Sequence, residues 1–436
     1  MKIHLAVINY YFEPFSLMSL SYTELLKSNR NFRNLFWGQL VSELGNWFNY
    51  IAGLGLVRIV SEASPEAAGL LLLCRTLPWA LLMPIAGTVA DLFSRKQIML
   101  ITDIIRAGLA LIFLFIETRE DLWLAYIGSA ILSATAAFFD GAKSAAVPNL
   151  TGKEGLLSGV ALMFSSRFLL MAIGAALGGI VASTLGYKTA FLVNSISFLI
   201  SAFSIWLIPA DSMEQKETQE REKESFVYEL KEGLHYTFSN SFVLTVLMMN
   251  IIWAIGGGAT FLIFEGLAVQ VFNTSNPDFV MSFLMTANAI GLTIGMLIAH
   301  KVGSIVEAKK QEINFVGLML ILHGIFFMIG GFVSSLPLAA LFILISRAIV
   351  GVEYAVQETM FQRSLPDYIR ARISTLDRGA EITVFSLSSY AAGIFLTFLP
   401  VQILAALAGA MSSSSGIFWL MRMKSQQALQ TEKQSA

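Results

Sequence analysis

Charged residues are scarce in this chain of 436 residues, where they make up 14% against roughly 25% in an ordinary soluble domain. The surface of a soluble protein of this length would need far more charge, so a soluble globular class is excluded. The formal net charge of -1 argues against a nucleic-acid partner. The single cysteine, Cys74, lies in an apolar run, so the chain cannot form an internal disulfide.

Catalytic and metal-binding patterns are missing as well. The four histidines, His4, His235, His300 and His323, are scattered with no metal-ligand spacing. The glycine run "AIGGGATF" is not followed by the Lys-Ser/Thr of a phosphate-binding loop, and we interpret it as a site of close helix packing. We therefore expect no enzyme and no cofactor.

Apolar residues are abundant, at 56% of the chain, and they gather in runs of about 20 residues. Each run is long enough to cross a hydrocarbon core of about 30 Å, which predicts an all-α polytopic membrane protein. Twelve membrane helices are expected, at 35–60, 66–91, 97–117, 122–145, 156–185, 188–209, 241–271, 279–302, 311–333, 337–360, 372–398 and 401–421.

One long polar segment, "DSMEQKETQEREKESFVYELKEG", divides these runs into six and six. Its Glu, Lys and Gln content predicts a solvated amphipathic helix at the membrane surface. The expected organisation is an N-terminal tail (1–34), a first six-helix bundle (35–209), a linker (210–240), a second bundle (241–421) and a C-terminal tail (422–436). The opening residues make a poor signal peptide, and a native start near Met18 is one interpretation of them.

The distribution of Lys and Arg predicts the orientation in the membrane. With a cytoplasmic N-terminus, the outer turns hold only Arg58, Arg119 and Lys188, whereas the inner segments hold nearly all other bases. We therefore expect both termini in the cytoplasm of a bacterium and the helices in its cytoplasmic (inner) membrane.

The stretch "GTVADLFSRK", Gly87 to Lys96, falls in the inner turn between the second and third helices. Gly87, Asp91 and Arg95 are spaced by four, so they share one helix face. We expect Gly87 to allow close approach of another helix and Asp91 to meet a helix N-terminus. Arg95 and Lys96 are expected at the lipid headgroups. A merely solvated basic turn would explain the two bases but not the spaced Gly and Asp.

The pattern G-x-x-x-D-x-x-x-R-K between helices 2 and 3 of a twelve-helix chain resembles the signature loop of the major facilitator superfamily. Other stretches resemble its drug-exporter-like branch, which includes macrolide and enterobactin exporters: "NFRNLFWGQLVSELGNWF", "RTLPWALLMPIAGTVAD", "FFDGAKSAAVPNL", "GAALGGIVASTLGYKTAFLVNSISFLISA" and "QRSLPDYIRARIST". The resemblance implies two six-helix bundles around a central cavity and transport by alternating access. It also implies that Asp91 contacts the start of helix 11, near Arg370, Arg372 and Arg378, while the inner side is closed.

Helix 1 carries a polar stripe of Gln39, Glu43, Asn46 and Tyr50, spaced by 4, 3 and 4 on one helix face. Polar side chains at membrane depth are costly when they face lipid, so the stripe should face a cavity or a neighbouring helix. It serves either a substrate or proton pathway or hydrogen bonding between helices, and the sequence leaves both open. Glu43 is the candidate for a titrating carboxylate.

Several other ionisable residues lie inside the predicted spans. Arg75, Arg167 and Arg347 each need an acid or a group of carbonyls, and Glu381 is the expected partner of Arg75. Asp377 and Glu381 share a face of helix 11, and we place them with the three arginines on the substrate or proton pathway. Static ion pairs between helices are the alternative. Asp103 with Arg106, and Asp140 with Lys143, are spaced as i,i+3 pairs and favour packing contacts.

These observations predict a secondary active transporter, most simply a monomeric, proton-coupled exporter (an antiporter) of lipophilic or amphipathic small molecules. Its partners would be a small-molecule substrate, protons and membrane lipids. Two alternatives stay open: a carrier of another substrate class, such as a lysophospholipid flippase or siderophore exporter, or a membrane receptor or scaffold on the same fold.

Overall fold

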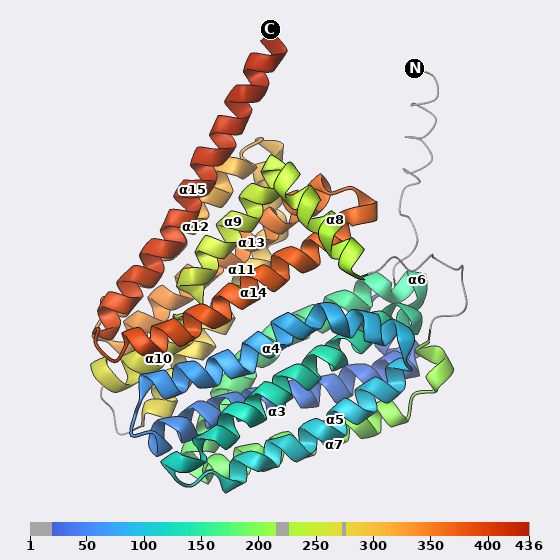
Figure 1. The fold of residues 1–436 in the computed structure, drawn as a ribbon, viewed down its shortest axis with the longest axis vertical. Coiled ribbons are helices and arrows are strands. Elements are labelled where there is room, and N and C mark those ends of the chain that lie inside the picture. The colour runs from blue at the N-terminus through green and yellow to red at the C-terminus, as the bar shows by residue number, and fades with distance from the viewer. Residues whose placement is uncertain (1–19, 215–225, 273–275, 436) are drawn as a thin grey trace.

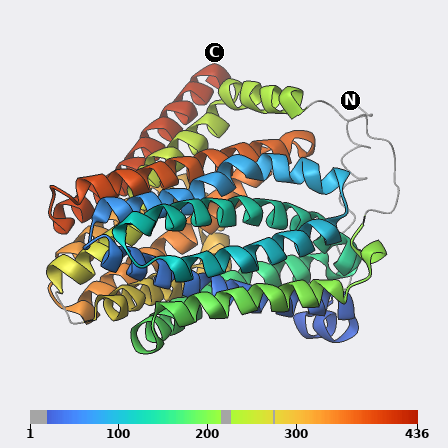
Figure 2. The same ribbon diagram turned by 60° about the horizontal axis from the view of Figure 1, so that its bottom comes forward.

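The computed structural model describes residues 20–214, 226–272 and 276–435, and these residues form helices joined by short turns. The helices are arranged as two groups, one from each half of the chain (Figure 1). A second view shows the long helices of both groups running roughly side by side (Figure 2).

The first bundle begins with a short helix of 7 residues, which has an N-terminal capping box, and continues through five long helices. In α2, Ser21 and Glu24 form a capping box, and the hydrogen bonds from Ser21 hold the pKa of the exposed Glu24 carboxyl below its usual value. The elements are α2 (Tyr22–Ser28), α3 (Arg30–Val60), α4 (Pro65–Leu92), α5 (Arg95–Ile112), α6 (Leu122–Leu185) and α7 (Tyr187–Trp206).

The second bundle follows a helix that occupies part of the predicted linker. This helix, α8 (Phe226–Ser239), packs on α14 and α9. The remaining elements are α9 (Ser241–Gly257), α10 (Thr260–Gly266), a π-helical turn (Leu267–Val271), α11 (Pro277–Ala308), α12 (Glu312–Phe332), α13 (Leu336–Ser364), α14 (Asp367–Phe395) and α15 (Val401–Ser435).

Ten helical segments of the described residues are long and apolar enough to cross a membrane. They are α4, α5, the two halves of α6, α7, the run from α9 to Val271, α11, α12, α13 and α15. Two further helices, α3 and α14, are equally long but carry the polar residues of the predicted pathway. Together they are consistent with the expected twelve.

Some expected boundaries are wrong. Helices 4 and 5 are not separated by a ten-residue loop, because helix continues through Pro148 and the chain turns at Gly152 alone, with φ of 66°. A left-handed φ favours glycine, and it allows this tight reversal. The predicted helix 7 is broken after Gly257, and the first helix begins at Arg30, inside the predicted tail. Residues 1–19, with the suggested start at Met18, lie outside the described part of the chain.

Two small-residue contacts join the bundles. A Cβ atom on Gly393 of α14 would lie 2.6 Å from the carbonyl oxygen of Pro65 and 3.0 Å from Cα of Gly69, both on α4. A Cβ atom on Gly179 of α6 would lie 2.0 Å from the Ser282 hydroxyl of α11. Without a side chain at these positions, the backbones of the two bundles approach closely, as small residues allow in membrane helices.

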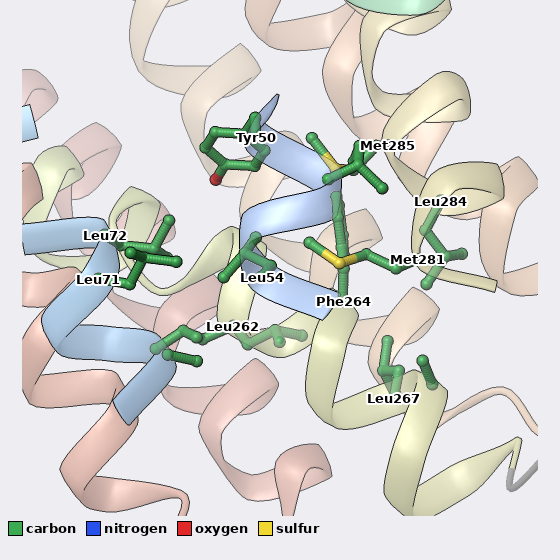
Figure 3. Close-up of a cluster of buried hydrophobic side chains, with 14 of the residues drawn as sticks. Tyr50, Leu54, Leu71, Leu72, Leu262, Phe264, Leu267, Met281, Leu284 and Met285 are labelled. Atoms are coloured by element: carbon green, nitrogen blue, oxygen red, sulfur yellow. The ribbon is translucent and has the colours of Figure 1, made fainter. Parts of the chain in front are cut away.

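A shared apolar cluster fills the space between these contacts (Figure 3). Leu54 of α3 and Leu71 and Leu72 of α4 lie against residues of the second bundle. The labelled partners from that bundle are Leu262, Phe264, Leu267, Met281, Leu284 and Met285. The two bundles therefore share one packed core at the end where α3 meets α4.

We expect Gly393→Ala to weaken the junction of the bundles, because the added methyl would clash with α4 backbone. Overpacking of this kind costs about 1–3 kcal/mol, so the melting temperature in detergent should fall. Gly379→Ala on the same helix is the matched control, since nothing lies within 4 Å of its added Cβ. It should leave the melting temperature unchanged or raise it. Equal effects from both substitutions would contradict this assignment of the junction.

Candidate functional site

A buried ion-pair network ties the bundles together at this shared core. Arg58, near the end of α3, donates to Glu265 of α10 over 2.7 Å and to Asp278 of α11 over 2.5 Å. Tyr187 of α7 donates its hydroxyl to the other oxygen of Asp278 over 2.6 Å. The three charged side chains are only 9–11% exposed. We call these four residues the Arg58 network.

Local structure places each member of the Arg58 network. Pro277 opens α11, so Asp278 lies in its first turn, where the helix dipole favours a carboxylate. Gly55, one turn before Arg58, leaves room for the Tyr187 ring and Asp278, which a Cβ would meet at 2.5 and 2.8 Å. One guanidinium and one phenol of the first bundle thus bind two carboxylates of the second.

The polar stripe of α3 contacts other helices of both bundles. Gln39 donates to Ser201 of α7 over 3.3 Å and accepts from Lys143 of α6 over 3.4 Å. Tyr50, at the other end of the stripe, is buried, and its ring packs edge-on against Phe261 of the second bundle at 5.5 Å between centroids. The half-buried Glu43 lies between these two positions. The two ends of the stripe therefore contact protein.

The predicted pair of Arg75 with Glu381 is wrong for this structure. Arg75 donates to the Asn49 side chain over 2.7 Å and to the Asn46 carbonyl over 3.1 Å, and it lies over the Tyr50 ring at 4.9 Å. These partners all lie on α3, although α4 packs along α14 as the sequence pairing assumed. Glu43 is one turn from Asn46 and within electrostatic range of the guanidinium.

Glu381 instead accepts from Arg378, its neighbour on α14, over 2.9 Å. Asp377, one turn before it, is 7% exposed and accepts from Asn250 of α9 over 2.9 Å. Arg347 of α13 is also buried; it donates to Thr260 over 2.8 Å and lies over the Phe327 ring at 5.3 Å. We expected an acid or a group of carbonyls around Arg347. Among the described residues, its guanidinium instead contacts the Thr260 hydroxyl and the Phe327 ring.

Both predicted i,i+3 pairs are confirmed. Asp103 and Arg106 of α5 form a fully buried ion pair, with the guanidinium over the rings of Phe139 and Phe198. Asp140 and Lys143 of α6 are 2.5 Å apart, and Trp79 of α4 donates to the same carboxylate over 3.0 Å. The third predicted arginine, Arg167, is exposed on α6.

The turn Gly87–Lys96 differs from expectation at Gly87, at Asp91 and at its two bases. A Cβ on Gly87 would meet nothing within 4 Å, so no helix approaches it here, and Gly141 of α6 makes the close contact with α4 instead, at Ala86. Asp91 is 64% exposed on its side chain and lies 3.8 Å from Arg95, so it does not contact the start of α14 in this conformation.

Arg95 and Lys96 bind protein carbonyls instead of the expected headgroups. The Arg95 guanidinium, 7% exposed, donates to the Ala145 and Met213 carbonyls over 3.1 Å each. Lys96 donates to the Trp206 carbonyl over 2.9 Å, at the C-terminal end of α7, where cations are favoured. The two bases therefore fasten the α4–α5 turn to α6 and to the end of α7.

Sequence reasoning missed the Arg58 network and the buried Glu353 of α13, which is 3% exposed. Arg58 looked like an outer-loop base. Glu265 and Glu353 could have been found, since each is a single acid within an apolar run ("FLIFEGLAV" and "VGVEYAV"), and ionisable residues at membrane depth are functional candidates by default.

The membrane-length helices, arranged in two bundles with a shared core, define a polytopic helical membrane protein. Residues 35–380 match the sequence profile of the Major Facilitator Superfamily. The chain belongs to this family, and its curated relatives include a putative exporter and a multidrug efflux pump.

Three relatives illustrate this similarity. The chain is 28% identical to the MFS-type transporter YfiS of Bacillus subtilis, over about half of each chain (51% and 53%). It is 26% identical to the putative bacilysin exporter BacE of Bacillus subtilis, over 63% of this chain and 66% of BacE. It is 23% identical to the multidrug efflux pump Tap of Mycolicibacterium fortuitum, over 88% and 89% of the two chains.

Solved structures share the fold. A bacterial homologue of the iron transporter ferroportin, in an inward-facing state, superposes with a TM-score of 0.67 and 14% identity, over 90% of this chain and 98% of that one. The nucleoside transporter NupG superposes with a TM-score of 0.69 and 12% identity, over 90% and 99%. The fold class predicted from the sequence is confirmed.

Proposed function

We propose that this chain exports lipophilic or amphipathic small molecules by alternating access, driven by proton entry. The Arg58 network carries the proposal, because it joins the bundles at one end by contacts that must separate when that end opens. In Figure 1 the bundles lie together near α10 and spread apart toward α8. The proposal places the opening of the passage at the end opposite the Arg58 network.

The direction of transport rests on the relatives. A putative bacilysin exporter and a multidrug efflux pump are among them, and both names describe export. The excess of Lys and Arg supports placing the α8 end and both termini in the cytoplasm and the helices in the inner membrane. The domain limits at 35–209 and 241–421, and a monomeric carrier, belong to the same proposal.

The test is transport in everted membrane vesicles that contain the overproduced protein. Fluorescent lipophilic dyes should accumulate inside when respiration acidifies the lumen, and a protonophore should abolish the accumulation. Vesicles without the protein provide the baseline. Dye movement that equals this baseline across a broad panel would favour a receptor or scaffold. Accumulation that survives the protonophore would refute proton coupling.

We expect Glu43→Gln to reduce gradient-driven transport strongly while the protein still folds. The carboxylate lies on the α3 polar stripe within electrostatic range of Arg75, and the amide keeps its size while removing its charge. Initial rates in the same vesicles measure the effect. Glu117→Gln, in an exposed pair with Lys188, is the matched control and should transport normally. Wild-type accumulation by the Glu43 variant would assign this carboxylate a structural role.

A further inference from the structure

A second group of acids lies inside the second bundle, away from the Arg58 network. Glu353 and Glu358 of α13 and Asp377 and Glu381 of α14 lie within electrostatic range of one another in the pairs Glu353–Glu381, Glu358–Asp377, Glu358–Glu381 and Asp377–Glu381. Arg378 lies within electrostatic range of two of the four, Asp377 and Glu381. A cluster with this excess of negative charge is costly away from water.

Two of the four acids have local partners. Glu381 accepts from Arg378 over 2.9 Å. Glu358 accepts from Gln362 over 2.6 Å, and Gln362 is held in turn by Ser374 over 2.9 Å. These two carboxylates can keep their charge, because each accepts a hydrogen bond and one also pairs with a cation.

The other two acids are buried and incompletely bonded. Glu353 is 3% exposed, and its Oε1 is enclosed without a hydrogen-bond partner. Asp377 is 7% exposed; its Oδ2 accepts from Asn250, whereas its Oδ1 is enclosed without a partner. Gln357, one turn after Glu353, is 2% exposed and has an enclosed amide nitrogen without a partner.

Other charged and titratable groups near Glu353 and Asp377 either bind other residues or carry no positive charge that could neutralise the two carboxylates. Tyr354 is near Asp377 and Glu381 and carries no positive charge. Several groups on the packed helices have their own partners: Arg75 of α4 with Asn46 and Asn49, Glu307 of α11 with Arg363, His323 of α12 with Ser346, Arg347 of α13 with Thr260, and Glu232 of α8 with Arg372.

An ionised carboxylate taken out of water without a cation costs several kcal/mol, and a group in that position takes up a proton or another cation. We propose that Glu353 and Asp377 form a proton-binding site of the second bundle. In this site each carboxyl oxygen that now lacks a partner carries the proton, which turns a bare acceptor into a neutral O–H. When Glu353 and Asp377 are both neutral, the remaining charged carboxylates of the group are Glu381, which pairs with Arg378, and Glu358, which accepts from Gln362.

The site would make the second bundle respond to the proton gradient, a consequence that rests on the proposed function. Proton binding itself requires no substrate. It can be measured on the purified full-length protein in detergent, by infrared difference spectra between acid and alkaline pH, where protonated carboxyl groups have their own carbonyl band.

The parent protein should show carboxyl bands that disappear as the pH rises. Glu353→Gln and Asp377→Asn should each remove one component, and the double variant should remove both. Glu307→Gln is the control, because its carboxylate is 54% exposed and paired with Arg363 over 2.5 Å. It should leave the bands as in the parent.

Two results would overturn the inference. The first is a parent protein without protonated-carboxyl bands at neutral and mildly acid pH, a result that needs no variant and does not depend on how variants fold. The second is a set of folded variants that keep the full parental bands. A protein that shows both components yet moves no dye in vesicles would refute the proposed function and leave this proton site standing.

Discussion

Replacing Arg58 by alanine should favour opening of the end that it closes. The substitution leaves Glu265 and Asp278 buried without their cation. Breaking a buried pair by removing one partner costs about 3–5 kcal/mol, and separation of the bundles relieves that cost by admitting water. Since about 1.4 kcal/mol changes an equilibrium tenfold, the open population should rise more than tenfold.

Cysteine labelling can measure this opening. Ala68 lines a pocket beside Arg58 and Glu265 and is 3% exposed, so a cysteine there is protected while the end is closed. In an Ala68→Cys, Cys74→Ala background, Arg58→Ala should speed labelling by a membrane-impermeant maleimide. Lys188→Ala, which breaks an exposed pair with Glu117, is the matched control and should label at the background rate. Equal rates for both substitutions would mean that Arg58 does not hold this end closed.

Asp103→Ala should cause the largest loss of stability within the first bundle. Asp103 is fully buried, and its removal leaves the Arg106 guanidinium, 6% exposed on its side chain, without its anion. We expect a loss of about 3–5 kcal/mol of stability, visible as a marked fall in melting temperature and in membrane yield. The rings of Phe139 and Phe198 offset only part of this, since a cation–π contact contributes about 2 kcal/mol when desolvated.

A double variant separates a broken pair from a general packing defect. Asp103→Leu with Arg106→Met replaces both charges by apolar groups, and such replacements of buried pairs are often neutral or stabilising. The double variant should therefore recover most of the lost melting temperature. A double variant as unstable as Asp103→Ala would show that the shape of the pair, and not its charge, holds α5 in place.

The helices and the short-range pairs could be predicted from the sequence. Apolar runs mark the spans because lipid requires them, and residues three apart on a helix are neighbours whatever surrounds them. Asp103 with Arg106 and Asp140 with Lys143 followed from spacing alone and were confirmed.

Partners on different helices could not be predicted in this way. Arg58 meets acids that lie 207 and 220 residues further along the chain, and no periodicity relates them. The sequence suggested Glu381 as the partner of Arg75, but in the structure the Asn49 side chain and the Asn46 carbonyl of α3 accept its hydrogen bonds. Arg95 was expected at headgroups because a base in a turn is usually solvated, yet the carbonyls of Ala145 and Met213 enclose it.

The contact between Gly69 and Gly393 has a mechanical consequence. Gly69 lies near the start of α4, so the helix beyond it, as far as Leu92, forms an arm of about 35 Å at about 1.5 Å per residue. If the bundles rock about this contact, a rotation of about 10° moves the tip of that arm by about 6 Å. The turn Gly87–Lys96 lies at that tip, where the displacement is largest. A small tilt of α4 caused by a methyl group added at the Gly69–Gly393 contact would therefore move this turn several-fold further than it moves the contact itself.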